Sequence, residues 1–400
     1  MYHVTIIGAG IVGLSTAWNI SLRYPQLKIC VLEKEAQAAA HQTGHNSGVI
    51  HAGIYYKPGS LKALNCQRGY AQLLDFCQTY GIAHDICGKV IVATKDSEKP
   101  LLDGIFRRGQ ENGLQGLKKL GPEAVREIEP HVQAVEGIWV PQTGIIDYRD
   151  VANQYLALIL ERGAMVHFQA KVRGIVTGPQ HATVETSGPT IHTRLVINCA
   201  GLYSDRVANM SGGINQNLKI LPFRGEYYAL QKEREYLVRN LIYPVPNPNF
   251  PFLGVHFTRM IKGGIEAGPT AVLAFSREGY TRWQIRPREL AEILLFPGFQ
   301  KIARAYWDDG WAEMKRAFSK ALFVKAVQQL IPEVRTEDLH RHGAGVRAMA
   351  CDADGNLIDD FLIVGKKQVI DVCNAPSPAA TASLAIGENI AARVAAYNLG

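Results

Sequence analysis

The feature that most constrains this chain is a glycine-rich turn between a strand and a helix near the N-terminus. Residues 4–7 (VTII) are apolar and mostly β-branched, as in a buried parallel strand. Gly8, Gly10 and Gly13 follow with GxGxxG spacing, and a helical pattern continues from them. A second strand, KICVLEK, reaches Glu33, 20 residues after Gly13. This context predicts a βαβ unit that binds a dinucleotide.

Each part of this unit has a physical role in holding a nucleotide. Gly8 makes the tight turn, Gly10 lets the backbone approach a pyrophosphate, and Gly13 lets helix and strand pack closely. Glu33 can accept hydrogen bonds from the adenosine ribose hydroxyls. The unit therefore fits the ADP half of either FAD or NAD, and the glycines alone do not decide between them.

Two later segments also place small residues at the start of a helix. In RLVINCAGLYSDRVA, residues 194–208, a buried strand leads through Ala200-Gly201 into a helix. Near the C-terminus, NAPSPAATASLAIGENIAARVAAY places a Pro/Ser/Ala turn before a helix, whose N-terminus can face an anion or an electronegative ring edge. FAD is longer than one βαβ unit and needs several segments, whereas NAD more often occupies a compact N-terminal domain. We therefore expect FAD.

Composition excludes several other classes of protein. The chain has 400 residues, enough for two coupled domains, and its net charge of +7 is modest and accompanied by no nucleic-acid-binding motif. Seven cysteines with neither CxxC nor zinc-site spacing indicate reduced thiols and no metal site. The N-terminus runs straight into a strand, and no apolar run approaches the roughly 20 residues that span a bilayer. We expect a cytoplasmic protein that does not cross a membrane.

Periodicity along the rest of the chain predicts both helices and strands. The predicted elements are helices over 61–80, 98–112 and 148–161, a strand over 89–94, antiparallel strands in MVHFQAKVRGIV and HATVETS, β-rich pieces in PFRGEYYAL and LGVHFTRM, and a largely helical block over 287–330. This mixture predicts an α/β protein.

Seven motifs lie along nearly the whole chain: EKE, HQTGHNSGVIHAGIYYKPGSLK, PFRGEYY, PFLGVHFTR, AGVRA, LIDDFLI and CNAPSPAATASLAIG. Together they resemble the D-amino-acid oxidase group of flavoenzymes, which includes sarcosine oxidases and glycerol-3-phosphate dehydrogenases. HNSGVIHAGIYY with NAPSPAAT is much more specific than GxGxxG. This combination is similar to the L-2-hydroxyglutarate dehydrogenase family within that group.

The resemblance implies a mixed α/β fold of the glutathione-reductase type, with a Rossmann-like FAD-binding domain and a second, mixed-sheet substrate domain. The FAD-binding domain would combine residues 1–85, 145–215 and 340–400, and the substrate domain 86–144 and 216–339. The implied reaction is oxidation of L-2-hydroxyglutarate to 2-oxoglutarate by hydride transfer from Cα to flavin N5. We expect the FAD to be bound noncovalently.

The resemblance also places the cofactor around particular residues. Those expected at the adenosine and pyrophosphate are Gly8, Gly10, Ile11, Val12, Gly13, Glu33 and Lys34, with Val172 at the adenine and Ala200 and Gly201 on the diphosphate side. Those expected at the ribityl chain and flavin are His45, Asn46, Ser47, Arg347, and the turn Pro376, Ser377, Pro378, Ala379, Ala380 and Thr381.

Oxidation of a 2-hydroxy acid also requires a base for the hydroxyl proton. A histidine suits this role because its unperturbed pKa is about 6.5. We expect His51, which follows the small-residue turn that would bring the chain beneath the flavin, and His256 is the second candidate. His45 is more suited to the cofactor.

A dianionic substrate needs at least two cationic partners, preferably arginines. The expected substrate-binding residues are Lys57, Tyr55, Arg224, Tyr228, Arg259, Arg347 and Asn374. Alternation along PFRGEYY would put Arg224 on one strand face with Glu226 and Tyr228, and would point Tyr227 the other way. Tyr55 and Tyr56 could each line the flavin or fill the core, and we expect one of each.

The reduced flavin must pass its electrons to oxygen, a quinone or an electron-transfer protein. Residues 296–330 combine Phe, Trp and Leu with several lysines and arginines, as in a basic helix that lies on an anionic bilayer and reaches quinone there. Peripheral attachment to the inner face of the cytoplasmic membrane is therefore one hypothesis. The alternative is an ordinary helix whose apolar face packs on the protein.

Two other functions compete with oxidation of L-2-hydroxyglutarate. An enzyme of the same group could act on an amine, another 2-hydroxy acid or glycerol-3-phosphate, because cations that bind carboxylates also suit a phosphate. A noncatalytic FAD-binding module attached to RNA is the other candidate. The sequence has no basic–aromatic platform for single strands, which argues against a nucleic-acid partner.

Overall fold

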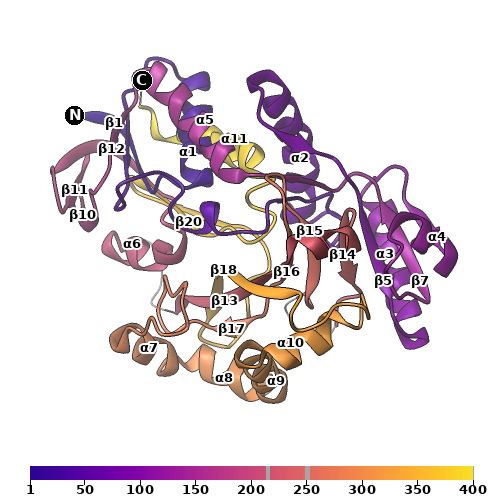
Figure 1. Cartoon of the computed structure of the whole chain (residues 1–400). Coiled ribbons are helices and arrows are strands. Elements are labelled where there is room, and N and C mark those ends of the chain that lie inside the picture. The colour runs from indigo at the N-terminus through magenta and orange to yellow at the C-terminus, as the bar shows by residue number, and fades with distance from the viewer. Residues whose placement is uncertain (213–216, 248–252, 400) are drawn as a thin grey trace.

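The structure is a computed structural model that describes residues 1–212, 217–247 and 253–399, in which helices cover two large sheets (Figure 1). Pro251 and Phe252 of the PFLGVHFTR motif, and residues 213–215 of the expected FAD-binding segment, lie outside the described residues. The strands of the first sheet follow one another in space as β10 (Val172–Thr177), β11 (Ala182–Thr186), β12 (Ile191–Asn198), β1 (Tyr2–Ile7), β2 (Ile29–Leu32) and β9 (Met165–His167), with β20 (Val369–Asn374) beside β12 and β19 (Leu362–Lys366) beside β20.

The centre of this sheet is parallel, as the βαβ prediction requires. Strand β1 pairs in parallel with both β2 and β12, and β12 pairs in parallel with β20. All four residues of β2 are buried, which matches its continuous apolar sequence. The carboxyl ends of these strands therefore meet at one edge, where an α/β sheet binds ligands.

Helices α1 (Ile11–Arg23), α2 (Leu61–Tyr80), α5 (Tyr148–Glu161) and α11 (Ser383–Val394) gather on one side of this sheet, and the short α6 (Ser204–Met210) lies on the other (Figure 1). Ser60 caps α2 as predicted, accepting a hydrogen bond from the Ala63 N–H at 3.2 Å. Helices α1 and α11 pack closely enough that a Cβ at Gly387 would lie 2.6 Å from Ser15 Oγ. Small residues at this crossing therefore set the position of α11.

The second sheet is mixed and carries the central strands of the substrate-side half. Its strands run β17 (Val272–Leu273), β13 (Leu218–Leu230), β16 (Ile265–Gly268), β15 (His256–Arg259), β14 (Leu241–Pro244), β5 (Lys89–Ala93), β7 (Glu136–Val140) and β6 (Lys118–Leu120), with β18 (Leu339–Asp352) along the other edge of β13. A small third sheet contains β3 (Val49–Ile50), β8 (Gly144–Ile146) and β4 (His84–Asp85).

The remaining helices are α3 (Lys99–Glu111), α4 (Pro122–Ile128), α7 (Pro287–Leu294), α8 (Pro297–Ala305), α9 (Trp307–Phe318) and α10 (Lys320–Val327), and the 3₁₀ turns are η1 (Gln42–Gly44), η2 (Asp96–Glu98), η3 (Gly201–Tyr203), η4 (Lys232–Leu237) and η5 (Ala395–Tyr397). The block expected as one helix over 296–330 is three helices. The chain leaves helical geometry at Tyr306 and at Ser319, whose side chain caps α10. Helix α10 buries Phe323, Val324 and Val327 in the core of the second sheet, α8 buries Ile302, and α9 buries Ala317.

Residues 340–352, expected in the FAD-binding domain, pair with the second sheet. These residues lie in β18, which pairs with β13 along the second sheet, and the first sheet resumes only at β19. Pairing between residues more than a hundred positions apart is not encoded in the local sequence pattern, so this pairing could not be predicted from the pattern. The division of the chain into two domains remains a prediction.

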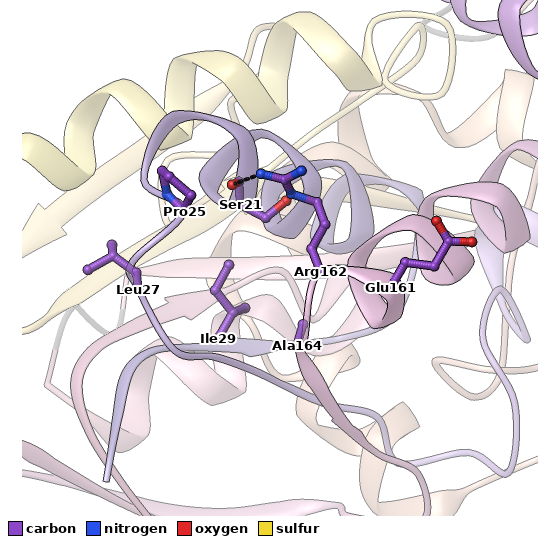
Figure 2. A pocket seen from close by; sticks show the side chains of 7 residues that line it. All are labelled: Ser21, Pro25, Leu27, Ile29, Glu161, Arg162 and Ala164. Carbon is purple, nitrogen blue, oxygen red and sulfur yellow. Dashed lines mark hydrogen bonds between the residues drawn. The ribbon is translucent and has the colours of Figure 1, made fainter.

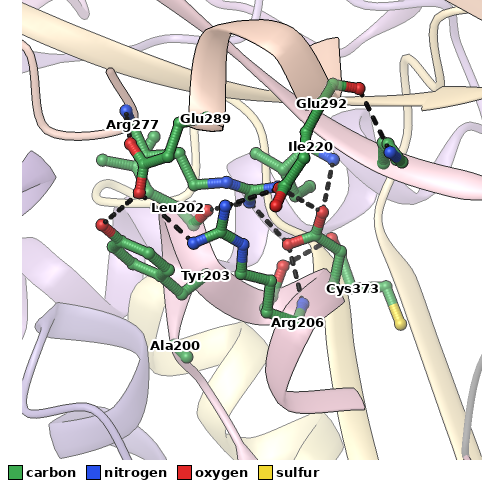
Figure 3. A network of polar contacts seen from close by, with 12 residues as sticks. Ala200, Leu202, Tyr203, Arg206, Ile220, Arg277, Glu289, Glu292 and Cys373 are labelled. Carbon is green, nitrogen blue, oxygen red and sulfur yellow. Dashed lines mark hydrogen bonds and ion pairs between the residues drawn. The ribbon is translucent and has the colours of Figure 1, made fainter. Parts of the chain in front are cut away.

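A buried network of ion pairs joins α6 of the first sheet to the segment that leads into α7 (Figure 3). The Arg277 guanidinium donates to both carboxylate oxygens of Asp205 at 2.6 and 2.7 Å, and each side chain is 4% exposed. Asp205 also accepts from the Ile220 N–H of β13, and Arg206 pairs with Glu289 and Glu292. The network therefore fixes α6, β13 and α7 relative to one another.

Candidate active site

The glycine turn has the geometry that the motif predicts. Gly8 has φ +105° and lies so close to the chain after β12 that a Cβ would stand 2.6 Å from the Cys199 carbonyl oxygen. A Cβ at Gly13 would stand 2.0 Å from the Gly8 carbonyl oxygen. At Gly10 the nearest atom is Thr43 Oγ1 at 3.4 Å, an ordinary contact. The protein itself thus requires glycine at 8 and 13, whereas the open space over Gly10 fits an apposed phosphate group.

Glu33 follows β2 and is held against this turn. Its carboxylate accepts hydrogen bonds from the N–H groups of Ala9 at 2.8 Å and Glu35 at 2.9 Å, and the residue is 8% exposed. Thr43 Oγ1 accepts from the Ile11 N–H at 3.0 Å, so the loop after η1 closes over the N-terminus of α1. An acidic group and a helix N-terminus beside open backbone suit the ribose and diphosphate of FAD.

Lys34 belongs to a charged cluster next to this turn. Its ammonium pairs with Glu35 and, at 2.6 Å, with Glu278, while His41 Nε2 lies 2.9 Å from Glu35 and 3.0 Å from Glu278. Burial opposes ionisation of His41, but its hydrogen bonds to Glu278 and Glu35 raise its pKa overall. The ligand atoms of Glu35, His41 and Glu278 lie within 4.8 Å of one another, and the Lys34 ammonium already balances their charge.

The other adenosine-side residues lie around the same edge of the first sheet. Gly201 has φ +54°, and a Cβ there would meet Gln42 Oε1 at 2.9 Å, which brings the turn after β12 against the loop of η1. Val172 begins β10 and is buried, and its backbone pairs with Thr186. Both residues are therefore placed by the strands that the sequence predicted.

The loop over residues 41–48 lines a cavity of about 450 Å³ together with residues of β13, β16 and β18 of the second sheet. His45 stacks on Tyr280 with ring centroids 4.2 Å apart, and Asn46 holds the loop by donating to the Gln42 and Thr43 carbonyls. The cavity is lined by Thr43, Gly44, His45, Asn46, Gly48, Ile146, Asp147, Tyr148, Arg149, Tyr227, Met260, Ile261, Lys262, Glu266, Tyr280, His342, Gly343 and Ala344. Ser47 is half-buried in the same loop.

A second cavity, of about 230 Å³, lies at the opposite end of α1 (Figure 2). Ser21, Pro25 and Leu27 line one side of it, and Arg162 crosses it to donate to the Ser21 carbonyl at 2.8 Å. Because Ser21 lies near the C-terminal end of α1 and the glycine turn precedes its N-terminus, this cavity is not part of the candidate site.

The expected base, His51, contacts the expected cofactor turn over residues 376–381, although 330 positions separate His51 from Thr381. Its N–H donates to Thr381 Oγ1 at 3.1 Å, and its Nε2 lies 3.5 Å from Ser377 Oγ. Thr381 also bonds to the Tyr148 hydroxyl at 2.7 Å. The turn from Pro376 to Thr381 therefore fixes His51 at the end of β3. The sequence predicted that His51 and this turn would both lie at the flavin.

His256 lies close to His51 and is neutral like it. Burial, followed by the charges of Lys89 and His256, lowers the pKa of His51 to about 3. Burial likewise lowers the pKa of His256 to about 3, although its Nδ1 bonds to the Gly254 carbonyl at 3.0 Å. The His256 ring packs against that of Tyr243 at a centroid distance of 4.0 Å, with the two ring planes tilted by 32°. Both imidazoles are therefore uncharged at neutral pH and can accept a proton.

Several expected substrate cations have partners within the protein. Arg224 is 1% exposed, pairs with Glu226 at 3.2 Å and donates to a carbonyl at 3.0 Å. Arg259 pairs with Asp85, and Lys57 is exposed on a turn. Arg224 and Glu226 do share a face of β13, as predicted. The structure therefore places Arg224 and Arg259 in ion pairs rather than beside His51.

The other expected substrate residues divide in the same way. Asn374 donates to the Ile358 and Asp360 carbonyls, and Tyr228 packs on Phe323. Both side chains therefore make contacts in the protein interior. By register, Arg347 faces the same side of the second sheet as Tyr227, opposite Arg224. The charge of Arg347 helps lower the pKa of His256, which places it with the histidines.

Two residues of this region were missed from sequence. Lys89, the first residue of β5, is buried beside Tyr55 and Tyr243, and Glu266 on β16 is buried at the 450 Å³ cavity with Oε2 unpaired among the described residues. Burial raises the pKa of Glu266 to about 7. The available signal was a charged residue inside an otherwise apolar strand pattern, KVIVA and IEAG.

Comparisons with known proteins show the family of the chain. The FAD dependent oxidoreductase family matches residues 3–393. The chain is 53% identical to L-2-hydroxyglutarate dehydrogenase of Indibacter alkaliphilus over 97% of its own length and 98% of that protein's. It is 44% identical to the human mitochondrial L-2-hydroxyglutarate dehydrogenase over 98% of its own length and 88% of that protein's.

The fold is also that of solved flavoproteins. The structure matches an L-alpha-glycerophosphate oxidase from Mycoplasma pneumoniae, solved with FAD bound, with a TM-score of 0.79 and 22% identity over 98% of this chain and 94% of that one. A glycine oxidase from Bacillus cereus matches with a TM-score of 0.71 and 17% identity over 99% and 95% of the two chains. With the family match over almost its whole length, the chain belongs to the FAD dependent oxidoreductase family.

Proposed function

We propose that this protein oxidises L-2-hydroxyglutarate to 2-oxoglutarate and binds FAD noncovalently for that purpose. The observation that carries the proposal is the convergence of His51, His256 and the 376–381 turn, joined to 53% identity over nearly the full length of a protein named for this activity. The residues over Gly10 and at Glu33 would hold the ADP half of the cofactor. Bound FAD supplies the hydride acceptor that side chains lack.

In this proposal His51 accepts the hydroxyl proton of the substrate at Nε2. The site without substrate keeps the imidazole neutral, because its pKa is about 3. A substrate carboxylate bound nearby would raise that pKa toward the range useful for a base. Ser377 and Thr381 orient the residue, and His256 is the second candidate for the same role.

Anaerobic mixing tests cofactor, substrate and reaction together. Addition of L-2-hydroxyglutarate should bleach the yellow flavin absorbance, whereas the D-enantiomer, glycine derivatives and glycerol-3-phosphate should bleach it much more slowly. Flavin should be released into the supernatant when the protein is denatured. Bleaching only by an amine or by glycerol-3-phosphate would assign the chain to another activity of its family.

We propose further that reoxidation takes place at a membrane surface, with quinone as acceptor, and that the protein attaches peripherally to the inner face of the cytoplasmic membrane. None of the described helices is both long enough and apolar enough to cross a bilayer. Helices α7–α9 and the segment before them nevertheless expose large apolar side chains, namely Trp283, Ile285, Leu294, Leu295, Trp307, Trp311 and Phe318. Apolar side chains among lysines and arginines are typical of surfaces that contact anionic lipid.

A further inference from the structure

Lys89 is a buried cation with an unusual set of neighbours. It begins β5 and is 1% exposed, and its ammonium lies 4.7 Å from the centroid of the Tyr55 ring and 4.6 Å from that of Tyr243. Within the described part of the chain, the ammonium faces these two rings and forms neither an ion pair nor a hydrogen bond. Ring faces attract a cation but do not replace a hydrogen-bonded counter-ion.

Among the described residues, the groups identified around Lys89 are neutral or cationic, and Arg347 is the second cation that acts on His256. Its charge contributes to the low pKa values of both His51 and His256, so the ammonium lies near the two candidate bases. Burial raises the pKa of the Tyr55 hydroxyl well above its usual value, and that of the Cys66 thiol to about 12. An unpaired buried charge is costly, and an anionic ligand beside Lys89 would supply the counter-ion that the described residues do not.

We propose that Lys89 binds one carboxylate of the substrate, between the rings of Tyr55 and Tyr243 and beside His51. The inference rests on the proposed function for the identity of the substrate. It replaces two expected cations, because Arg224 and Arg259 are paired with Glu226 and Asp85. A carboxylate at Lys89 would also bring negative charge to His51, which favours the protonated imidazole that forms when the hydroxyl proton is taken.

The test is a titration of the FAD-loaded protein with glutarate, a dicarboxylate without the oxidisable hydroxyl. Binding is measured by the change in the flavin absorbance spectrum. Lys89→Met keeps the length of the side chain and removes the charge. We expect this variant to retain FAD and to bind glutarate at least about 30-fold more weakly than the wild type. Unchanged glutarate affinity in a variant with full FAD content would overturn the proposal.

Lys119→Met is the matched control. Lys119 lies on β6 of the same sheet and also faces an aromatic ring, that of Phe106 at 5.5 Å, but it is exposed and pairs with Asp103. Its loss should leave glutarate affinity within twofold of the wild type. A weakening as large as that of Lys89→Met would show a general effect of charge and count against the proposal.

If Lys89→Met does not fold, the wild type still decides the question. Burial lowers the pKa of Lys89 to about 7, while the nearby imidazoles are neutral above pH 5 and Tyr55, Tyr243 and Cys66 stay protonated through pH 9. Glutarate should therefore bind progressively more weakly from pH 6 to 9, both in the wild type and in Glu266→Gln, which removes the other nearby group with a pKa of about 7. An affinity that stays constant over this range in Glu266→Gln would refute the assignment. A wild type that binds glutarate in this way but is not reduced by L-2-hydroxyglutarate would disprove the proposed function alone.

Discussion

At the scale of single residues, the proposed base makes the first prediction. His51→Ala should retain FAD, because the backbone N–H that donates to Thr381 is kept and only the 3.5 Å contact of the ring with Ser377 is lost. Flavin reduction by L-2-hydroxyglutarate should slow by about 10²- to 10⁴-fold, the usual contribution of a general base. Stopped-flow absorbance under anaerobic conditions measures this rate.

His181→Ala is the control for that experiment, since His181 is exposed on the turn between β10 and β11. The flavin of this variant should be reduced by L-2-hydroxyglutarate at the wild-type rate. If the flavin of His51→Ala is also reduced at the wild-type rate while that of His256→Ala is reduced more slowly, then His256 accepts the proton and His51 serves only in packing.

The pH dependence of kcat/KM follows from the same residues. Since the pKa values of both imidazoles lie near 3 in the free enzyme, neither should produce a rise in kcat/KM between pH 5 and 7. Lys89 carries its charge below a pKa of about 7, so kcat/KM should fall as pH rises through that value. An ascending limb near pH 6.5 would instead reveal a histidine with an ordinary pKa as the base.

A pair of glycine substitutions separates cofactor binding from folding. Gly10 has a φ of −78° and only an ordinary contact to Thr43, so Gly10→Ala should fold normally and lose FAD because its methyl group occupies the space over the turn. Gly13→Ala should fold poorly, because its Cβ would stand 2.0 Å from the Gly8 carbonyl oxygen. Flavin content and thermal melting of the two apoproteins measure the difference, and equal melting temperatures would contradict it.

At the scale of elements, the buried network between α6 and α7 makes a prediction about stability. Asp205→Ala leaves the Arg277 guanidinium buried without its carboxylate, which should lower the free energy of unfolding by about 3–5 kcal/mol. Arg288→Ala removes an exposed pair with Glu292 on the same helix and should have no measurable effect. Denaturant unfolding measures both, and an equal effect of the two changes would show that the buried pair is not a strong contact.

Elements that depend on local sequence were the most predictable. The glycine turn, the capped helix α2 and the turn before α11 each carry their own signal, in GxGxxG, in Ser60 and in the Pro/Ser/Ala run. Features that depend on long-range pairing were not predictable. Arg224 was expected at the substrate because a dianion needs cationic partners. The strand face that it shares with Glu226 was correctly assigned, but on that face it pairs with Glu226 and lies away from the histidines. Lys89 was missed because its environment is formed by Tyr55 and Tyr243, which come from distant parts of the chain.

At the scale of the whole molecule, the two large sheets meet around the candidate site while α7–α10 form a separate edge (Figure 1). The candidate base is thus held by β3 and by the turn before α11, and the exposed apolar side chains belong to different elements. Changes on α7–α9 should therefore affect membrane contact without changing flavin reduction.

Membrane contact can be tested on this basis with sedimented vesicles. The wild type should bind vesicles of mixed neutral and anionic lipid at low salt, and replacement of Leu295, Trp307 and Trp311 by serine should abolish most of that binding, since these side chains are 75%, 66% and 54% exposed. The rate of flavin reduction by L-2-hydroxyglutarate should be unchanged in the triple variant, whereas electron transfer to a lipid-dissolved quinone should fall. Serine in place of Val176 on β10, 61% exposed and outside this edge, is the matched control. Wild-type protein that remains entirely in the supernatant at low salt would show that these apolar side chains do not bind lipid.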